Sequence, residues 1–268
     1  MSENAVEHKI EVIADIHKEA GNKLVVSYLT LRNLIGFSGF FLPIFLIFYS
    51  VIYRGGRLES SISDYYYTDC GDVFVVILSA ISIFLITYNG YDKKEKLLTN
   101  IAAIAGLGTA FFPTNSIGHS SIQSRHRLLP DPPELFNLFE LHFVFAILFF
   151  LCISIITLVY FPKTNVDVVD KPKNVVHQKN CRNRMYRCCG WIMIGCIILL
   201  GLYFKIDFIH RLFGELPMVF ILETIAILAF GLSWITKGQS LWPDDKHYIT
   251  ESLEKAQSMM SSTNLISS

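Results

Sequence analysis

Three ionisable side chains in this sequence combine the chemistry of acids, bases and metal ligands, and each stands beside a long apolar segment. They are Asp64, His142 and Glu223. A carboxylate next to an imidazole can fix the tautomer of the ring and raise its pKa, so that the pair holds a metal ion or acts as a general base. We therefore take these three residues as candidate catalytic or metal-binding groups.

Each of these groups also has a purely structural explanation. His142 opens an apolar segment between Phe139 and Phe143, where its ring can serve as an interfacial side chain with one polar tip. Glu223 lies inside another apolar segment, where it can be a protonated or hydrogen-bonded packing residue that faces other helices. The sequence leaves the structural and the chemical explanations open.

Further polar residues accompany this trio. His126 lies between Arg125 and Arg127 in a proline-containing loop, residues 114–138, which can contact a phosphate headgroup or simply cover the bundle as a solvated lid. The chain contains no zinc-protease helix motif, no nucleotide-binding loop and no nucleophile elbow. The other candidates for a polar cluster are Ser61, Ser63, Asn100, His119 and His126.

The elements that must position these residues are apolar helices. Six stretches come near the roughly 20 residues that a helix needs to cross a bilayer core of about 30 Å. We predict an all-α, polytopic integral membrane protein with six transmembrane helices. The predicted spans are residues 31–53, 73–91, 97–113, 139–161, 190–204 and 217–236.

The charged residues outline the rest of the organisation. Hydrophobic residues make up 52% of the 268 positions and charged residues 17%, and the charges fall mainly in the tails and connecting segments, which argues against a soluble core protein. We expect a cytoplasmic amphipathic segment (residues 1–30), the transmembrane domain (31–236) and a cytoplasmic tail (237–268). We predict that residues 162–187 form a flexible connection that contacts anionic lipid headgroups.

The distribution of basic residues predicts the orientation. Most of the 23 lysine and arginine residues fall in the tails and in the segments that follow the second and fourth spans. By the positive-inside rule both termini are then cytoplasmic, and the Ser-Ile-Ser-Asp segment at 61–64 faces outward. The predicted location is a cell membrane, the bacterial inner membrane or its equivalent. Cys70 is then the outward-facing cysteine, which leaves no external pair for a disulfide within the chain.

The third span carries a face of small residues. Ala102, Gly106 and Ala110 recur every four positions, so they line one side of a helix. Within a membrane, helices associate by close packing, and small residues let their backbones approach. We predict that this face packs against neighbouring helices.

Four short motifs between residues 60 and 160 resemble a known group of proteins. They are Ser-Ile-Ser-Asp at 61–64, Asn100 early in the third span, Phe-Phe-Pro at 111–113 and Leu141-His142 opening a Phe-rich fourth span. Together they resemble the DRAM/Frag-type six-span membrane proteins and related bacterial six-span membrane families of unknown function. The resemblance implies a six-helix fold with a polar cluster beneath an outer loop. In some eukaryotic relatives it implies roles in lipid-anchor remodelling and membrane trafficking.

Two functional interpretations follow from the sequence. In the first, the protein binds a lipid or a membrane partner through an outward-facing polar cleft. In the second, it is a membrane-embedded lipid hydrolase or lipid-remodelling enzyme that uses Asp64, His142 and Glu223, with or without a metal. The expected partners are membrane lipids and not nucleic acid, and helix faces offer contacts for a homo- or hetero-oligomer. The sequence identifies no cofactor.

Overall fold

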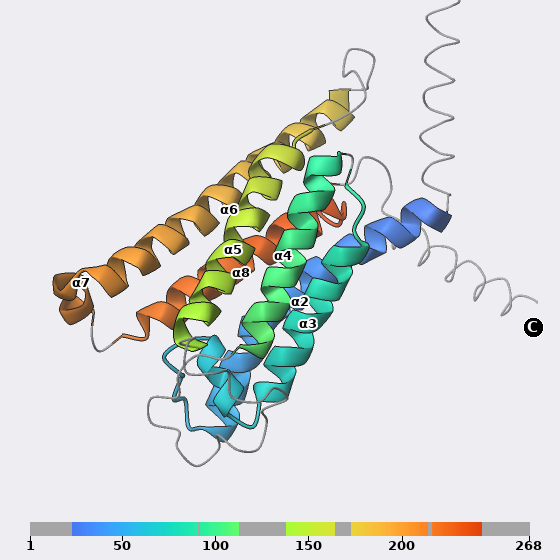
Figure 1. The fold of residues 1–268 in the computed structure, drawn as a ribbon. Helices are drawn as coiled ribbons and strands as arrows, with labels where there is room; N and C mark the ends of the chain where they lie inside the picture. Colours follow the sequence, from blue (N-terminus) through green and yellow to red (C-terminus); the bar gives the residue numbers. More distant parts are fainter. Residues whose placement is uncertain (1–22, 91, 113–137, 164–172, 214–215, 243–268) are drawn as a thin grey trace, which may run out of the picture.

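The computed structural model describes residues 23–90, 92–112, 138–163, 173–213 and 216–242, and these residues form helices and connecting turns without any strand (Figure 1). The fourth predicted segment continues from an α-helix into a π-helical stretch, η2. The elements are α2 (Lys23–Tyr53), the 3-10 helix η1 (Ser63–Tyr67), α3 (Gly71–Thr87), α4 (Lys93–Phe111), α5 (Leu138–Ile155), η2 (Ile156–Tyr160), α6 (Lys173–Lys205), α7 (Asp207–Leu212) and α8 (Met218–Lys237).

Four helical stretches in the described residues are long and apolar enough to cross a membrane. They are Tyr28–Tyr53, Leu141–Tyr160, His177–Lys205 and Met218–Lys237. The helix α3 is apolar but has only 17 residues, and the first turn of α4 is charged. Large apolar side chains such as Phe48, Val144 and Trp191 are exposed on the outside of the bundle, as on a surface that meets lipid.

The predicted flexible connection at 162–187 is wrong in its second half, because α6 begins at Lys173 and runs for 33 residues. The reason is a helical repeat hidden among polar residues. Tyr186, Cys189 and Met193 recur every three or four positions, and all three are buried in the central core. Burying one face stabilises a helix even where its mean hydropathy is low.

The helices pack in two groups of three. The helix α8 packs against α2 and α6, while α4 packs against α3 and α5. A Cβ atom added to Gly36 would lie 2.6 Å from the backbone nitrogen of Ile235, and one added to Gly231 would lie 2.7 Å from the carbonyl oxygen of Gly36. The backbones of α2 and α8 therefore touch, which only glycine at these positions allows.

The small-residue face of α4 is buried, as predicted. Ala102 and Ala110 are fully buried, and a Cβ atom on Gly106 would collide with the Ser82 hydroxyl and lie 3.2 Å from the Phe149 ring. The face therefore sits between α3 and α5 and not against lipid.

The bundle has two polar ends, and Trp234 packs beside one of them, against Tyr88 and Phe161. Residues of α2, α4 and α8 form the basic end, which we define by Arg32, Glu95 and Lys237. There the start of α2 meets the end of α8, since Arg32 Nη1 lies 3.4 Å from the Lys237 carbonyl oxygen. The opposite end, here the η1 end, carries η1 and the beginnings of α3, α5 and α8 (Figure 1).

Candidate functional site

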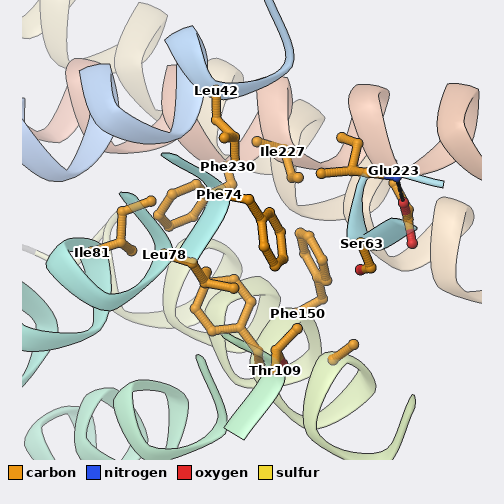
Figure 2. A pocket seen from close by; sticks show the side chains of 13 residues that line it. Leu42, Ser63, Phe74, Leu78, Ile81, Thr109, Phe150, Glu223, Ile227 and Phe230 are labelled. Atoms are coloured by element: carbon orange, nitrogen blue, oxygen red, sulfur yellow. Dashed lines mark hydrogen bonds between the residues drawn. The ribbon is translucent and has the colours of Figure 1, made fainter. Parts of the chain in front are cut away.

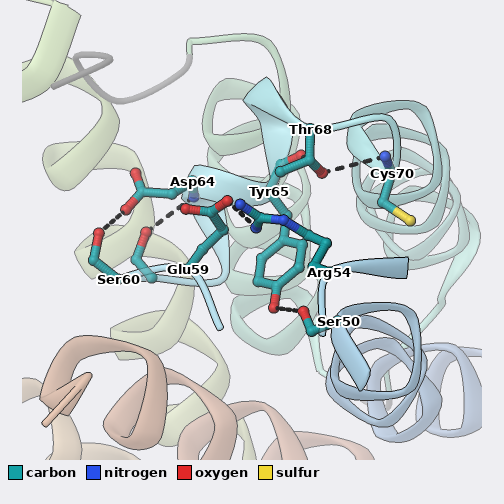
Figure 3. Close-up of polar contacts among 9 residues, drawn as sticks. Ser50, Arg54, Glu59, Ser60, Asp64, Tyr65, Thr68 and Cys70 are labelled. Carbon is teal, nitrogen blue, oxygen red and sulfur yellow. Dashed lines mark hydrogen bonds and ion pairs between the residues drawn. The ribbon is translucent and has the colours of Figure 1, made fainter. Parts of the chain in front are cut away.

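Local hydrogen bonds shape the segment that carries η1. The Ser61 hydroxyl accepts from the backbone N–H of Asp64 at 3.0 Å, a local bond that stabilises the turn at the start of the short helix. At its end, Thr68 Oγ1 donates to the Tyr65 carbonyl at 2.8 Å and accepts from the Cys70 N–H at 3.2 Å (Figure 3). The sequence Ser-Ile-Ser-Asp therefore favours a compact turn that leads directly into α3.

Side-chain contacts hold this turn against α2. The chain reverses after α2 through two glycines with positive φ, Gly55 and Gly56. The hydroxyls of Ser50 and Tyr65 are hydrogen-bonded to each other, and Tyr65 is completely buried. Arg54 forms an ion pair with Glu59 (Figure 3). The turn and η1, which together we call the plug, are thus packed against α2.

Glu223 joins the start of α8 to the same turn. Its Oε2 accepts from the backbone N–H of Ile62 at 2.6 Å, and the backbone of Ser63 also hydrogen-bonds to this carboxyl group. The N–H of Phe220 donates to the Ser60 carbonyl at 2.9 Å. Two consecutive backbone amides therefore face one carboxyl group, an arrangement that favours a side-chain oxygen acceptor at this position.

His142 connects α5 to both η1 and the end of α4. Its Nδ1 lies 2.7 Å from the Phe112 carbonyl oxygen, and its Nε2 lies 2.9 Å from Ser63 Oγ. A carbonyl oxygen can only accept, so Nδ1 carries a proton, and in the neutral ring Nε2 then accepts from the Ser63 hydroxyl. The ring is buried, with 2% of its surface exposed.

Asp64 lies in η1 itself, so the three predicted residues share the η1 end, each with its own hydrogen-bond partners. The Ser60 hydroxyl donates to the Asp64 carboxylate. Asp64 also lies near enough for its charge to act on both His142 and Glu223. The topology explains this meeting, because the starts of α5 and α8 both lie at the η1 end.

The arrangement of donors does not fit a metal ion. Among the described residues no three His, Cys, Asp or Glu side chains gather as ligands. Both nitrogens of His142 face protein hydrogen-bond partners, and Glu223 faces backbone amides. These side chains are therefore not arranged to hold a metal ion at the η1 end.

The other predicted polar residues are placed differently. Ser61 and Ser63 belong to the turn and are buried. Asn100 lies in the first half of α4, 11 residues before Phe111, which is about 16 Å along a helix, so it does not join the η1 end. Its Oδ1 has no hydrogen-bond partner in the described part of the chain. His119 and His126 lie outside the described residues, as do the predicted amphipathic segment before residue 23 and the tail after 242.

A cavity lies directly beneath η1, in the middle of the bundle (Figure 2). Its volume is about 50 Å³. Three lining residues, Ser63, Thr109 and Glu223, bring polar atoms to it. The remaining lining is apolar and strongly aromatic: Leu42, Ile62, Phe74, Leu78, Ile81, Ala146, Phe149, Phe150, Ile227 and Phe230.

The basic end is a second buried polar cluster, and the sequence analysis missed it. The guanidinium carbon of Arg32 lies 4.1 Å from the centre of the Tyr28 ring, and Lys237 Nζ donates to the Phe161 carbonyl at 3.0 Å. Glu95, whose charge acts on Lys237, accepts from the Tyr88 hydroxyl at 2.9 Å. Arg32 and Lys237 had been counted as loop charges, although both border predicted spans.

A wider groove runs along the first part of α6 near the basic end. Its volume is about 500 Å³, and Trp242, whose carbonyl accepts from Arg182 at 2.5 Å, closes one side. The lining on α6 is largely polar: His177, Asn180, Cys181, Arg184, Met185 and Cys188. The groove is a surface feature, unlike the cavity beneath η1.

Comparisons with protein-family models, with curated proteins and with solved structures find no match to this chain. The resemblance of residues 60–160 to DRAM/Frag-type proteins therefore stays a prediction.

Proposed function

We propose that this protein is an integral membrane protein of six transmembrane helices that binds an acyl chain of a membrane lipid in the cavity beneath η1. In this proposal α3 and α4 cross the membrane with the four longer helices, because they pack within the same bundle. The basic end faces the cytoplasm, in line with the positive-inside rule, and the η1 end faces outward.

The observation that carries this proposal is the composition of the cavity wall. Pockets for lipid-like ligands are mainly apolar, with a few polar groups that fix the orientation of the ligand. Here apolar side chains, among them Phe150 and Phe230, form most of the wall, while Ser63 and Glu223 stand at the η1 side (Figure 2). An acyl chain among the aromatic rings would place its carbonyl group near Ser63.

The size of the cavity limits the ligand. One water molecule needs roughly 10–15 Å³ measured in the same way, and the cavity offers about 50 Å³. It therefore suits a short stretch of one acyl chain, with the remainder of the lipid outside the cavity.

The test uses a phospholipid that carries a photoreactive diazirine on one acyl chain. The protein, purified in detergent with this lipid, is irradiated, and cross-linked residues are mapped by mass spectrometry. We expect cross-links on the buried Phe149 as well as on the lipid-exposed Phe48.

A cavity-filling variant makes this test specific. Ala146→Leu adds a side chain inside the cavity and should abolish the cross-link at Phe149 while that at Phe48 persists. Val144→Leu, an exposed position on the same helix, is the matched control. Cross-links confined to surface residues in the unmodified protein, or an unchanged Phe149 cross-link in Ala146→Leu, would contradict the proposal.

A further inference from the structure

Ser63 occupies a special position, because it lines the cavity and is also hydrogen-bonded to an imidazole. Its Oγ lies 2.9 Å from His142 Nε2. The other ring nitrogen, Nδ1, is held 2.7 Å from the Phe112 carbonyl oxygen, and the backbone of Thr109 also hydrogen-bonds to the ring. Because these acceptors keep the proton on Nδ1 in the neutral ring, the lone pair of Nε2 points at the Ser63 hydroxyl.

This is the arrangement by which proteins activate a serine. A weak hydroxyl nucleophile needs a base within about 2.6–3.2 Å, and the base needs a third group that fixes its orientation. Here a backbone carbonyl takes the orienting role that a carboxylate has in Ser-His-Asp triads.

We propose that Ser63 is an acyl-accepting nucleophile with His142 as its general base, and that the substrate is the ester of a membrane lipid. This inference rests on the proposed lipid binding, since the acyl chain in the cavity brings the ester carbonyl to Ser63. The reaction class is acyl transfer from the lipid ester to Ser63.

The reaction needs no reagent other than the lipid ester and water. Ser63 Oγ bonds to the ester carbonyl carbon while its proton passes to His142 Nε2. The bond from that carbon to the alcohol oxygen breaks, and the alcohol leaves with the proton from Nε2. Water then attacks the acyl-serine ester, giving up one proton to Nε2, and the fatty acid leaves as Ser63 recovers that proton. A second lipid alcohol in place of water would make the reaction an acyl transfer.

The two backbone amides that face Glu223 complete the site. Acyl transfer passes through an intermediate with a negatively charged oxygen, which backbone amides stabilise when they are aimed at it. The amides of Ile62 and Ser63 are adjacent to the nucleophile and now hold an oxygen of Glu223. The Glu223 side chain must therefore move aside for the intermediate to use these amides.

A simpler explanation is that the bond between Ser63 and His142 only ties η1 to α5. The test that separates the two explanations uses a long-chain alkyl fluorophosphonate, which reacts with activated serines, and mass spectrometry of the intact purified protein. We expect one adduct, located at Ser63. Ser63→Ala should abolish it, whereas Ser240→Ala, a partly exposed serine at the basic end, should keep it.

The role of the base is tested by rate. Removing a general base slows its reaction by roughly 10²–10⁴-fold, so His142→Gln should slow labelling of Ser63 by at least 10²-fold in protein that still melts cooperatively. A merely structural histidine would leave the labelling rate of folded protein unchanged. An equal rate in His142→Gln therefore overturns the general-base assignment, whatever the effect on stability.

The acyl transfer is tested with a p-nitrophenyl ester of a medium-chain fatty acid. We expect nitrophenolate release and an acyl adduct on Ser63, both lost in Ser63→Ala. If Ser63 takes up neither probe while the diazirine lipid still cross-links to Phe149, the nucleophile is overturned and lipid binding stands. If the cross-link to Phe149 is also missing, the proposed function itself fails.

Discussion

The two ends of the bundle bury polar side chains for different purposes. At the basic end, Arg32 and Lys237 lie against aromatic rings and main-chain carbonyls, and these contacts join α2, α8 and the end of η2. At the η1 end, Ser63 and Glu223 border a cavity. Buried polar groups in a membrane bundle need partners in either case. At the η1 end, Ser63 and Glu223 line this cavity, whereas the groove near the basic end is lined by residues of α6 and by Trp242. We therefore propose a ligand site at the η1 end and a structural role for the buried charges of the basic end.

The largest contrast that we propose between the two ends is the side of the membrane that each end faces. Arg57→Cys, an exposed position in the turn before η1, should react completely with a membrane-impermeant thiol reagent on intact cells. Cys188, exposed on α6 toward the basic end, should react only after the cells are opened. For the Arg57→Cys measurement, Cys181 and Cys188 are replaced by serine.

Arg57→Cys serves as the reporter of the η1 end in place of the native Cys70. Cys70 is 5% exposed, and burial raises the pKa of its thiol, so it reacts poorly even if the reagent reaches its side of the membrane. Labelling of Cys188 on intact cells would reverse the proposed orientation.

The next largest effect concerns stability at the basic end. Glu95→Ala removes a fully buried carboxylate near two buried cations, and breaking a buried charge cluster costs about 3–5 kcal/mol. We expect a large drop in the melting temperature of the detergent-solubilised protein. Lys94→Ala, an exposed neighbour, should change it little. Similar melting of the two variants would show that the basic end does not hold the helices together.

Between the two ends, the packing of α4 is tested by its small-residue face. Gly106→Leu drives a side chain into Ser82 and Phe149, and such overpacking costs about 1–3 kcal/mol. Gly201→Leu on α6 is the matched control, since no described atom lies within 4 Å of a Cβ there. Thermal melting should separate the two variants, and equal melting would place the α4 face against lipid.

The smallest effect is expected where the plug meets α2. Tyr65→Phe keeps the buried ring and removes its hydrogen bond to Ser50, which costs about 1 kcal/mol. Tyr53→Phe, at an exposed position on the same helix as Ser50, is the control and should be neutral. A variant Tyr65→Phe as stable as the control would mean that apolar packing alone holds η1.

Hydropathy predicted the helices well because apolar runs of about 20 residues have few other uses. The first part of α6 was missed because its buried residues, Tyr186 and Cys189, stand among three arginines that lower the mean hydropathy, Arg182, Arg184 and Arg187. Four helical stretches in the described residues are long and apolar enough to cross a membrane. That α3 and α4 also cross it stays a prediction.

The sequence grouped the candidate residues, and their role as a site stays a prediction. Asp64, His142 and Glu223 could be grouped because each lies at the same end of an apolar segment. The partners of each side chain depend on sub-ångström geometry between α5, α8 and η1, which a pattern of residue types does not contain. The link from His142 to Ser63 therefore emerged only from the fold. The basic end was missed because charges at span borders were taken to be solvated.

The central claim, that the η1 end serves a ligand and the basic end serves the fold, is tested most directly by measuring two variants in parallel. Ala146→Leu and Glu95→Ala are each assayed for melting temperature and for the diazirine cross-link at Phe149. We predict that Ala146→Leu loses the cross-link and melts near the unmodified protein. Glu95→Ala should melt far lower, while its folded fraction keeps the cross-link. If both variants lose the cross-link and the stability together, the two ends do not have separate roles and the account is wrong.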